Sequence, residues 1–179
     1  ATGVELWVAD FKNATAKKLT EGTLNANMRD VINWFKDGSS ILVKMLPENR
    51  KDLINTNTAV PTGPTISTSD GQKAQNRTYQ DLLQTPNDEF NFEQLAHASL
   101  VKVDLNGMTT EWKSSNMYSN ISFSPDGNYV MVSSIKKPFS YLVPYYRFPF
   151  ETLIYDKTGK EVSKVNDVPL SEVLPIGFM

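Results

Sequence analysis

Two stretches of the chain share one pattern of apolar and polar positions. Residues 32–46 read INWFKDGSSILVKML, and residues 121–135 read ISFSPDGNYVMVSSI. In each, an apolar run with an aromatic residue is followed by Asp-Gly and then by a second run rich in β-forming residues. Gly38 and Gly127 tolerate the positive φ of a tight turn, and the aspartate before each can hydrogen-bond to the neighbouring backbone. The pattern predicts strand, turn and strand in each stretch.

A second pattern occurs three times and alternates with the first. A short β-rich run ends in aspartate, a polar turn follows, and another run comes after it, over residues 5–20, 99–113 and 152–165. Asn106-Gly107 and Thr158-Gly159 are typical hairpin-turn dipeptides. Two hairpin types that alternate in a fixed order predict four-stranded antiparallel sheets, which are the blades of a β-propeller. We therefore predict an all-β fold, a partial β-propeller, with a β-sandwich as the alternative.

The order of these units sets the expected boundaries within a single fragment, residues 1–179, of about two and a half blades. We expect residues 5–20 to form the outer half of one blade, residues 30–113 a second blade that contains an inserted arm at 47–98, residues 114–165 a third blade, and residues 166–179 a link to the next. Trp34 and Phe123 each precede an Asp-Gly turn by three residues. We expect these two side chains to occupy equivalent core positions between blades.

The inserted arm has a polar half and a partly helical half. Its first half is rich in Asn, Thr, Pro, Gly and Ser, which predicts a loop. In the second half, Thr78 can cap a helix that Pro86 ends, and Asn87 can cap another that follows. The apolar side chains of this half are Leu82, Leu83, Phe90, Phe92 and Leu95. We expect this helical half to dock on the sheets, while residues 55–76 stay mobile on the surface.

Residues 136–150, KKPFSYLVPYYRFPF, are rich in aromatic residues and lie between the two hairpins of the last expected blade. A central strand would not carry Pro138, Pro144 and Pro149, because proline cannot donate to the hydrogen-bond ladder. Two interpretations stay open. The segment is either an extended connection packed on the blade or an exposed aromatic surface that meets a partner domain or a substrate.

Composition narrows the function classes. The chain has 179 residues, a net charge of −2, scattered lysine and arginine, and no cysteine. The charge argues against nucleic acid as a partner, and the lack of cysteine excludes disulfides and Cys-ligated metals. No run of apolar residues is long enough to predict a membrane span, and no motif calls for a cofactor. The chain starts at Ala1 without an initiator Met and stops in an apolar segment, so we expect a longer parent protein.

The sequence lacks a catalytic constellation. It contains no G-x-S-x-G nucleophile elbow, and His97 is its single histidine. We interpret His97 as a structural or surface residue, and the adjacent Asp88 and Glu89 as a solvated helix start. We expect the isolated chain to show no peptidase activity.

Four strings identify a resemblance. LNANMRDVINWFKDGSSILVKMLP, VPTGP, RTYQDLL and PFSYLVPYYRFP together resemble the propeller of prolyl-oligopeptidase-family serine peptidases, in the glutamyl-endopeptidase-like branch of bacteria and plant chloroplasts. The resemblance covers nearly the whole chain, and the last two strings are the most specific because blade geometry does not require them. It implies a propeller that caps a C-terminal α/β-hydrolase domain carrying the Ser, Asp and His of the triad. None of that domain is present, so no catalytic residue is carried over.

The resemblance implies an accessory role. The propeller would gate and help to bind peptide substrates for the hydrolase domain of the same parent chain, which would cut peptide bonds, with glutamate before the bond as the branch's preference. Such a side chain needs a cationic or hydrogen-bond-donating partner. Tyr141, Tyr145, Tyr146 and Arg147 are the candidates to face substrate or the partner domain, and for Arg147 a purely structural surface role is the alternative.

Further expectations concern the origin, the compartment and the association state of the protein. A bacterial protein, periplasmic or secreted rather than cytoplasmic, is favoured. The open fragment is expected either to self-associate through its uncovered sheet faces and edges or to fold its own arm across one of them. The rival hypothesis from another class is a non-enzymatic β-propeller that serves as a protein-interaction module. A G-x-S-x-G motif encoded beyond Met179, followed by Asp and His, would decide for the peptidase.

Overall fold

A computed structural model describes residues 3–55, 58 and 79–172. Within these ranges the strands are β1 (Trp7–Asp10), β2 (Thr15–Lys18), β3 (Ile32–Trp34), β4 (Ser40–Met45), β5 (Ala98–Asp104), β6 (Thr109–Asn116), β7 (Tyr118–Phe123), β8 (Tyr129–Ile135), β9 (Phe150–Asp156) and β10 (Glu161–Val168). The helix α1 spans Pro86–Ala96, and the 3-10 turn η1 spans Tyr145–Arg147. The fold is mostly β, as predicted.

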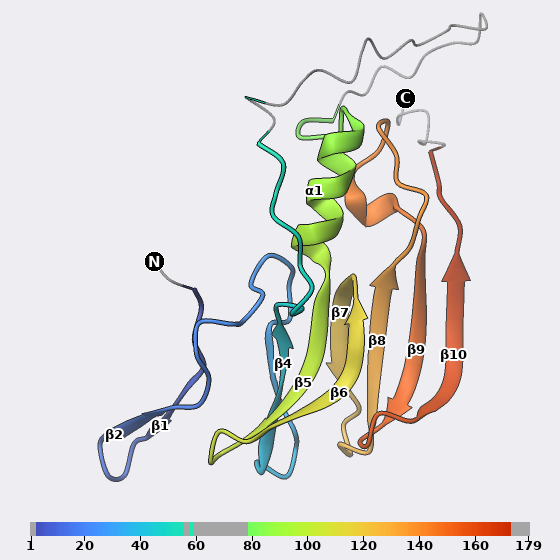
Figure 1. The fold of residues 1–179 in the computed structure, drawn as a ribbon. Helices are drawn as coiled ribbons and strands as arrows, with labels where there is room; N and C mark the ends of the chain where they lie inside the picture. Colours follow the sequence, from blue (N-terminus) through green and yellow to red (C-terminus); the bar gives the residue numbers. More distant parts are fainter. Residues whose placement is uncertain (1–2, 56–57, 59–78, 173–179) are drawn as a thin grey trace, which may run out of the picture.

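The strands form three antiparallel sheets (Figure 1). The first is the β1–β2 hairpin, the second has the order β3-β4-β5-β6, and the third has the order β7-β8-β9-β10. Within each sheet every strand pairs with its neighbours in sequence, so each four-stranded sheet is a meander of hairpins. The two kinds of hairpin predicted from the sequence are therefore confirmed, together with their order.

Aspartate and glycine close the turns in the predicted manner. Asp37 Oδ1 accepts the amide of Ser39 at 3.0 Å, and Asp126 Oδ1 accepts the amide of Asn128 at 3.0 Å. Gly38 and Gly127 have φ values of 69° and 77°, in the left-handed region that glycine enters without strain. The hydroxyl of Ser124 and the amide and side chain of Asn128 lower the pKa of Asp126 to about 2. These turns are thus held by local bonds.

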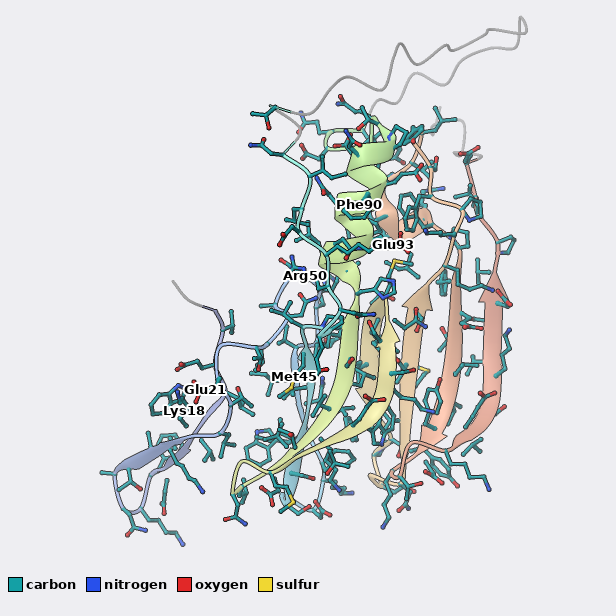
Figure 2. All side chains as sticks on the ribbon, viewed as in Figure 1. Lys18, Glu21, Met45, Arg50, Phe90 and Glu93 are labelled. Carbon is teal, nitrogen blue, oxygen red and sulfur yellow. The ribbon has the colours of Figure 1, made fainter. Side chains whose placement is uncertain are left out.

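Alternation along the strands divides the second sheet into two buried faces. Ile41 and Val43 of β4 point, with Val103 of β5, into a cluster shared with Leu6 and Leu19 around the β1–β2 hairpin. On the opposite face of the sheet, a second cluster joins the third sheet, with members Phe35, Leu42, Leu100, Trp112, Tyr118, Ile121, Val130, Val132 and Tyr155. The two four-stranded sheets are therefore packed face to face, as expected. The other face of the second sheet is buried by residues that flank the β1–β2 hairpin, Leu6, Leu19 and Leu24, while the hairpin strands themselves are largely exposed. Lys18 also pairs with Glu21 at 2.7 Å beside the hairpin (Figure 2).

The prediction that Trp34 is a core residue is wrong. Its side chain is 48% exposed, while Phe123 is half-buried and packs edge-on against Phe35 with ring centroids 5.0 Å apart. Trp34 pairs with Ile41 and so points toward the β1–β2 side of its sheet. Strand β3 is the edge of that sheet, and the two-stranded hairpin leaves this edge uncovered.

The helical half of the arm contains one helix where two were expected. Residues 79–85 are not helical, and Asp81 has a φ of 58°, which a right-handed helix cannot contain; Thr78 lies outside the described residues. Helix α1 begins at Pro86, and its cap is Thr85 rather than Asn87. The Thr85 hydroxyl and the Asp88 carboxylate form a reciprocal capping box. Proline is therefore the first helical residue, where its missing N–H costs nothing.

Helix α1 docks against the segment that links β8 to β9. Phe92 packs edge-on against Phe139 and Phe148, with centroid distances of 5.1 and 5.7 Å. Leu83 and the buried Ala96 join the same cluster, so the expected docking of this half is confirmed for these side chains. The expectation for residues 55–76 falls almost entirely outside the described residues.

Candidate functional site

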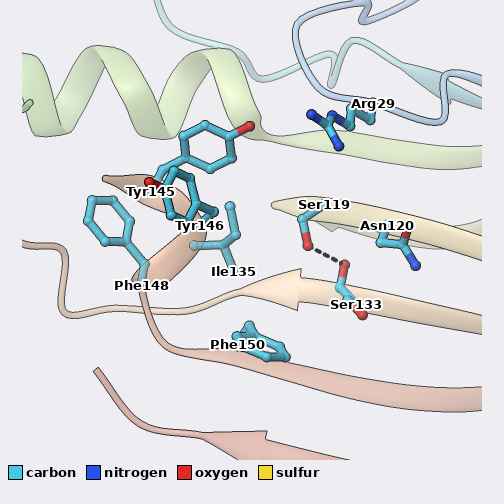
Figure 3. A pocket seen from close by; sticks show the side chains of 9 residues that line it. All are labelled: Arg29, Ser119, Asn120, Ser133, Ile135, Tyr145, Tyr146, Phe148 and Phe150. Atoms are coloured by element: carbon cyan, nitrogen blue, oxygen red, sulfur yellow. Dashed lines mark hydrogen bonds between the residues drawn. The ribbon is translucent and has the colours of Figure 1, made fainter. Parts of the chain in front are cut away.

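A cavity of about 450 Å³ lies where the third sheet meets the segment before β9 (Figure 3). Its lining comes from the loop before β3, from β7, β8 and β9, and from η1. The lining residues are Arg29, Ser119, Asn120, Ser133, Ile135, Tyr145, Tyr146, Phe148 and Phe150. A cavity of this size accommodates a side chain or a short peptide segment.

One wall of the cavity is polar. The hydroxyl of Ser119 on β7 donates to the carbonyl oxygen of Ser133 on β8 at 3.2 Å, and the hydroxyls of Ser133 and Thr152 are 2.8 Å apart. The exposed guanidinium of Arg29 stands across the opening from the aromatic residues (Figure 3). This wall therefore offers a fixed positive charge and several hydroxyl and amide groups to a ligand.

The other wall is aromatic. Tyr145 and Tyr146 pack at right angles with ring centroids 6.0 Å apart, and Tyr145 also meets Phe92 of α1 at 6.1 Å. Phe148 is buried, whereas Tyr145 and Tyr146 are 41% and 64% exposed. The two interpretations of residues 136–150 therefore each describe part of the segment. Its phenylalanines anchor the connection to the protein, and its two adjacent tyrosines present an open aromatic surface.

The predicted site residues fall into two pairs. Tyr145 and Tyr146 line the cavity, whereas Tyr141 and Arg147 are not among its lining residues. A hydrogen bond with Glu89 of α1 raises the pKa of Tyr141 to about 12, so this side chain is engaged with the helix. Arg147 ends η1, where its amide donates to the carbonyl of Pro144 at 2.9 Å.

The cation of the cavity is Arg29, which sequence reasoning missed. It precedes β3 by three residues and reaches a cavity formed by the other four-stranded sheet. Its backbone direction is fixed by Asp30, which has a φ of 56°, and the Asp30 carboxylate accepts the amide of Ile121 on β7 at 3.1 Å. One feature of the sequence could have indicated Arg29. When the two Asp-Gly repeats are aligned, the charged pair Arg29-Asp30 stands where the later repeat has the uncharged pair Tyr118-Ser119.

His97 lies at a separate place, between α1 and β6. Its Nδ1 is 3.1 Å from the hydroxyl of Ser115, and its Nε2 is 3.8 Å from a carboxylate oxygen of Glu93. The other oxygen of that carboxylate is 2.7 Å from Nζ of Lys137, so the charge of Glu93 is already paired. Burial is the main cause of the lowered pKa of His97. These contacts join the end of the helix to the sheet.

The cavity has the chemistry of a binding site. Its lining residues supply a cation, hydroxyls, an amide and aromatic faces, and they include neither a carboxylate nor a histidine. A carboxylate-bearing ligand fits this set, because guanidinium and hydroxyl groups donate to carboxylate oxygens and aromatic faces cover apolar atoms. Within the described part of the chain, no helix is long and apolar enough to cross a membrane.

Fold and cavity define a mostly β chain of three antiparallel sheets with one helix and a cavity at one end of the third sheet. This chain is 34% identical over 175 residues to a protein of Arabidopsis thaliana named probable glutamyl endopeptidase, chloroplastic; the match covers 96% of this chain and 18% of that protein. A protein of the same name from Oryza sativa subsp. japonica is 33% identical over 177 residues, 97% of this chain and 19% of its own length.

These matches link the chain to peptidases and leave most of each relative unmatched. The chain spans about a fifth of the length of the curated relatives it matches. No protein-family model and no solved structure matches it. Both relatives are plant proteins, and a bacterial origin stays a prediction.

Proposed function

We propose that this chain is a non-catalytic segment of a larger serine peptidase of the prolyl-oligopeptidase type. In this proposal, residues 5–20, 30–113 and 114–165 are consecutive parts of a β-propeller, and residues 166–179 lead to the next blade. Support comes from three antiparallel sheets that follow one another in sequence, two of which pack face to face, and from similarity to proteins named glutamyl endopeptidase over nearly the whole chain. The triad would lie on a C-terminal α/β-hydrolase domain of the same parent chain.

The role proposed for the segment is to gate and bind peptide substrates. The observation that carries it is the cavity in which the exposed Arg29 faces Tyr145 and Tyr146 across a floor of serine hydroxyls. Arg29 would pair with the carboxylate of a glutamyl side chain, while the tyrosine rings would cover its methylene groups and the adjacent backbone. Tyr141 and Arg147, outside the cavity, are proposed as contacts to the hydrolase domain.

Binding of matched peptides to the purified chain tests this role. A short peptide containing glutamate and the same peptide with glutamine should be titrated while tyrosine fluorescence or binding heat is recorded. We expect the glutamate peptide to bind more tightly and Arg29→Gln to remove the preference, with a loss of about fivefold because an exposed ion pair contributes at most about 1 kcal/mol.

Arg50→Gln is the matched control for this experiment. Arg50 lies beside the separate pocket that contains His97, so its loss removes the same charge from the chain without touching the proposed site. Equal affinity for both peptides, or an equal loss of affinity in the two arginine variants, would show that the cavity does not recognise a carboxylate.

A second candidate, a non-enzymatic protein-interaction module, is favoured by a different surface. The face of the third sheet that points away from the second exposes Tyr129, Met131 and Val162 around an apolar pocket of about 470 Å³. The coding sequence beyond Met179 separates the candidates. A downstream G-x-S-x-G followed by Asp and His, with peptidase activity of the full-length protein, supports the peptidase, and their absence supports the module.

A further inference from the structure

Lys44 is a charged side chain buried between the two four-stranded sheets. It lies on β4 and is 1% exposed. Its ammonium donates to the carbonyl oxygen of Arg29 at 2.5 Å and to that of Tyr118 on β7 at 2.7 Å. Lys44 therefore joins the loop before β3 to the first strand of the neighbouring sheet.

The position equivalent to Lys44 in the third sheet is uncharged and lies on the less covered face of that sheet. Lys44 follows Asp37 by seven residues, and in the third sheet the residue seven positions after Asp126 is Ser133. Burying an ammonium is costly, and burial lowers the pKa of Lys44 to about 8 although the negative charge of Asp30 acts in the opposite direction. A costly buried charge that is held by two backbone carbonyls from different segments points to a specific local role.

The two carbonyls that Lys44 holds belong to two separate segments that both contribute to the polar wall of the cavity. One is the carbonyl of Arg29, the cation of the cavity, and the other is that of Tyr118, whose next residues, Ser119 and Asn120, line it. Asp30 adds a second tie, because its carboxylate accepts the amide of Ile121 at 3.1 Å. The backbone at Asp30 has a φ of 56°, in the left-handed region that few non-glycine residues occupy and in which aspartate is enriched.

We propose that Lys44 is a positioning residue for the cavity: its buried ammonium fixes the distance between the loop that carries Arg29 and the strand that carries Ser119. The inference rests on the proposed function in that it assigns Lys44 to the same carboxylate-binding site. Lys44 touches no ligand in this role and acts through the two backbone segments.

Hydrogen exchange in the unliganded chain tests the positioning directly. Lys44→Met keeps most of the buried chain length and removes both donors. We expect the amide of Ile121 to exchange at least about tenfold faster in this variant, because the segment that carries Asp30 loosens. Lys44→Gln, which keeps two N–H donors, should recover part of this protection and is the substitute if the methionine variant does not fold.

Lys102→Met is the matched control. Lys102 is a half-buried lysine of β5 in the same sheet, and its ammonium lies over the ring of Phe35 rather than on the cavity walls. Its loss should leave the exchange of Ile121 within about twofold of the parent once both variants are compared under fully folded conditions. Equal protection in Lys44→Met and the parent, or an equal loss in both lysine variants, would overturn the inference.

A binding cycle separates this inference from the proposed function. If Lys44 acts through Arg29, Lys44→Met should weaken binding of the glutamate peptide about threefold or more in the parent and have no further effect in Arg29→Gln. Independent effects of the two substitutions would contradict positioning through Arg29. If the parent chain does not bind the peptide, the proposed function fails. The hydrogen-exchange rate of the Ile121 amide still decides whether Lys44 holds the loop that carries Arg29 against the strand that carries Ser119.

Discussion

The second and third sheets have the same strand order and the same turns, yet they differ in how many of their faces are buried. The second sheet is covered on one face by the segments that flank the β1–β2 hairpin and on the other by the third sheet. The third sheet is covered on one face by the second, and among the described residues its other face exposes Tyr129, Met131 and Val162 and is buried only near Ile135. Side chains at equivalent positions of the two sheets therefore contribute differently to the free energy of unfolding, because burial depends on what packs against a sheet as well as on the strand pattern.

Leu42 and Met131 give the sharpest form of this comparison. Each lies five residues after the Asp of its turn, on the face that points toward the next sheet, but Leu42 is 0% exposed and Met131 is 36% exposed. We expect Leu42→Ala to lower the free energy of unfolding by about 3–5 kcal/mol and Met131→Ala by less than about 1 kcal/mol. Denaturant titration of both variants measures the two values.

The same pair also reports on the larger protein. If a further sheet covers Met131 in the full-length parent, Met131→Ala should become costly there and remain mild in the isolated chain. Comparable losses for Leu42→Ala and Met131→Ala in the isolated chain would show that its third sheet is already covered, for example by a second copy.

Phe123 and Trp34 provide a second comparison, for which we expect a smaller difference in the free energy of unfolding than for Leu42 and Met131. Both side chains point toward the preceding sheet, but only Phe123 meets a four-stranded one. Phe123→Ala should lower the free energy of unfolding by about 2–3 kcal/mol, whereas Trp34→Ala should cost about 1 kcal/mol or less. A larger loss at Trp34 in urea titration would mean that this indole is covered in solution.

The third prediction concerns the pH dependence of stability, because Lys44 is a buried charge in the second sheet and the equivalent residue of the third sheet is Ser133. The pKa of Lys44 falls from 10.5 to about 8 on folding, so between these pH values the unfolded chain binds more protons than the folded chain. The free energy of unfolding should therefore rise with pH through this window by about 1–2 kcal/mol more in the parent than in Lys44→Met. Parallel pH profiles of the parent and the variant would show that the ammonium is not desolvated.

The hairpins could be predicted from sequence because their determinants are local. Asp104 and Asp156 each accept backbone amides from their own turns, and Gly107 and Gly159 supply the positive φ that follows. Such bonds need no distant residue. The capping box of α1 is equally local, and the Thr-Pro-x-Asp string shows it once proline is taken as the first residue of a helix.

The parts that could not be predicted depend on contacts across the sheets. Trp34 is exposed because of the limited width of the hairpin beside it. Arg29 reaches a cavity of the other sheet, and Lys44 lies in a run, SILVKM, that shows only a lysine in a β-strand. Nothing within that run indicates that its carbonyl acceptors lie 15 and 74 residues away.

The unequal connections at equivalent places in the two sheets bear on how the chain folds. Residues 46–97 separate β4 from β5, whereas residues 136–149 separate β8 from β9, so the first connection is almost four times as long. Each doubling of a loop adds about 0.6 kcal/mol of closure entropy, so closing the β4–β5 pair costs about 1 kcal/mol more. The third sheet should therefore form ahead of the second and offer it a preformed surface.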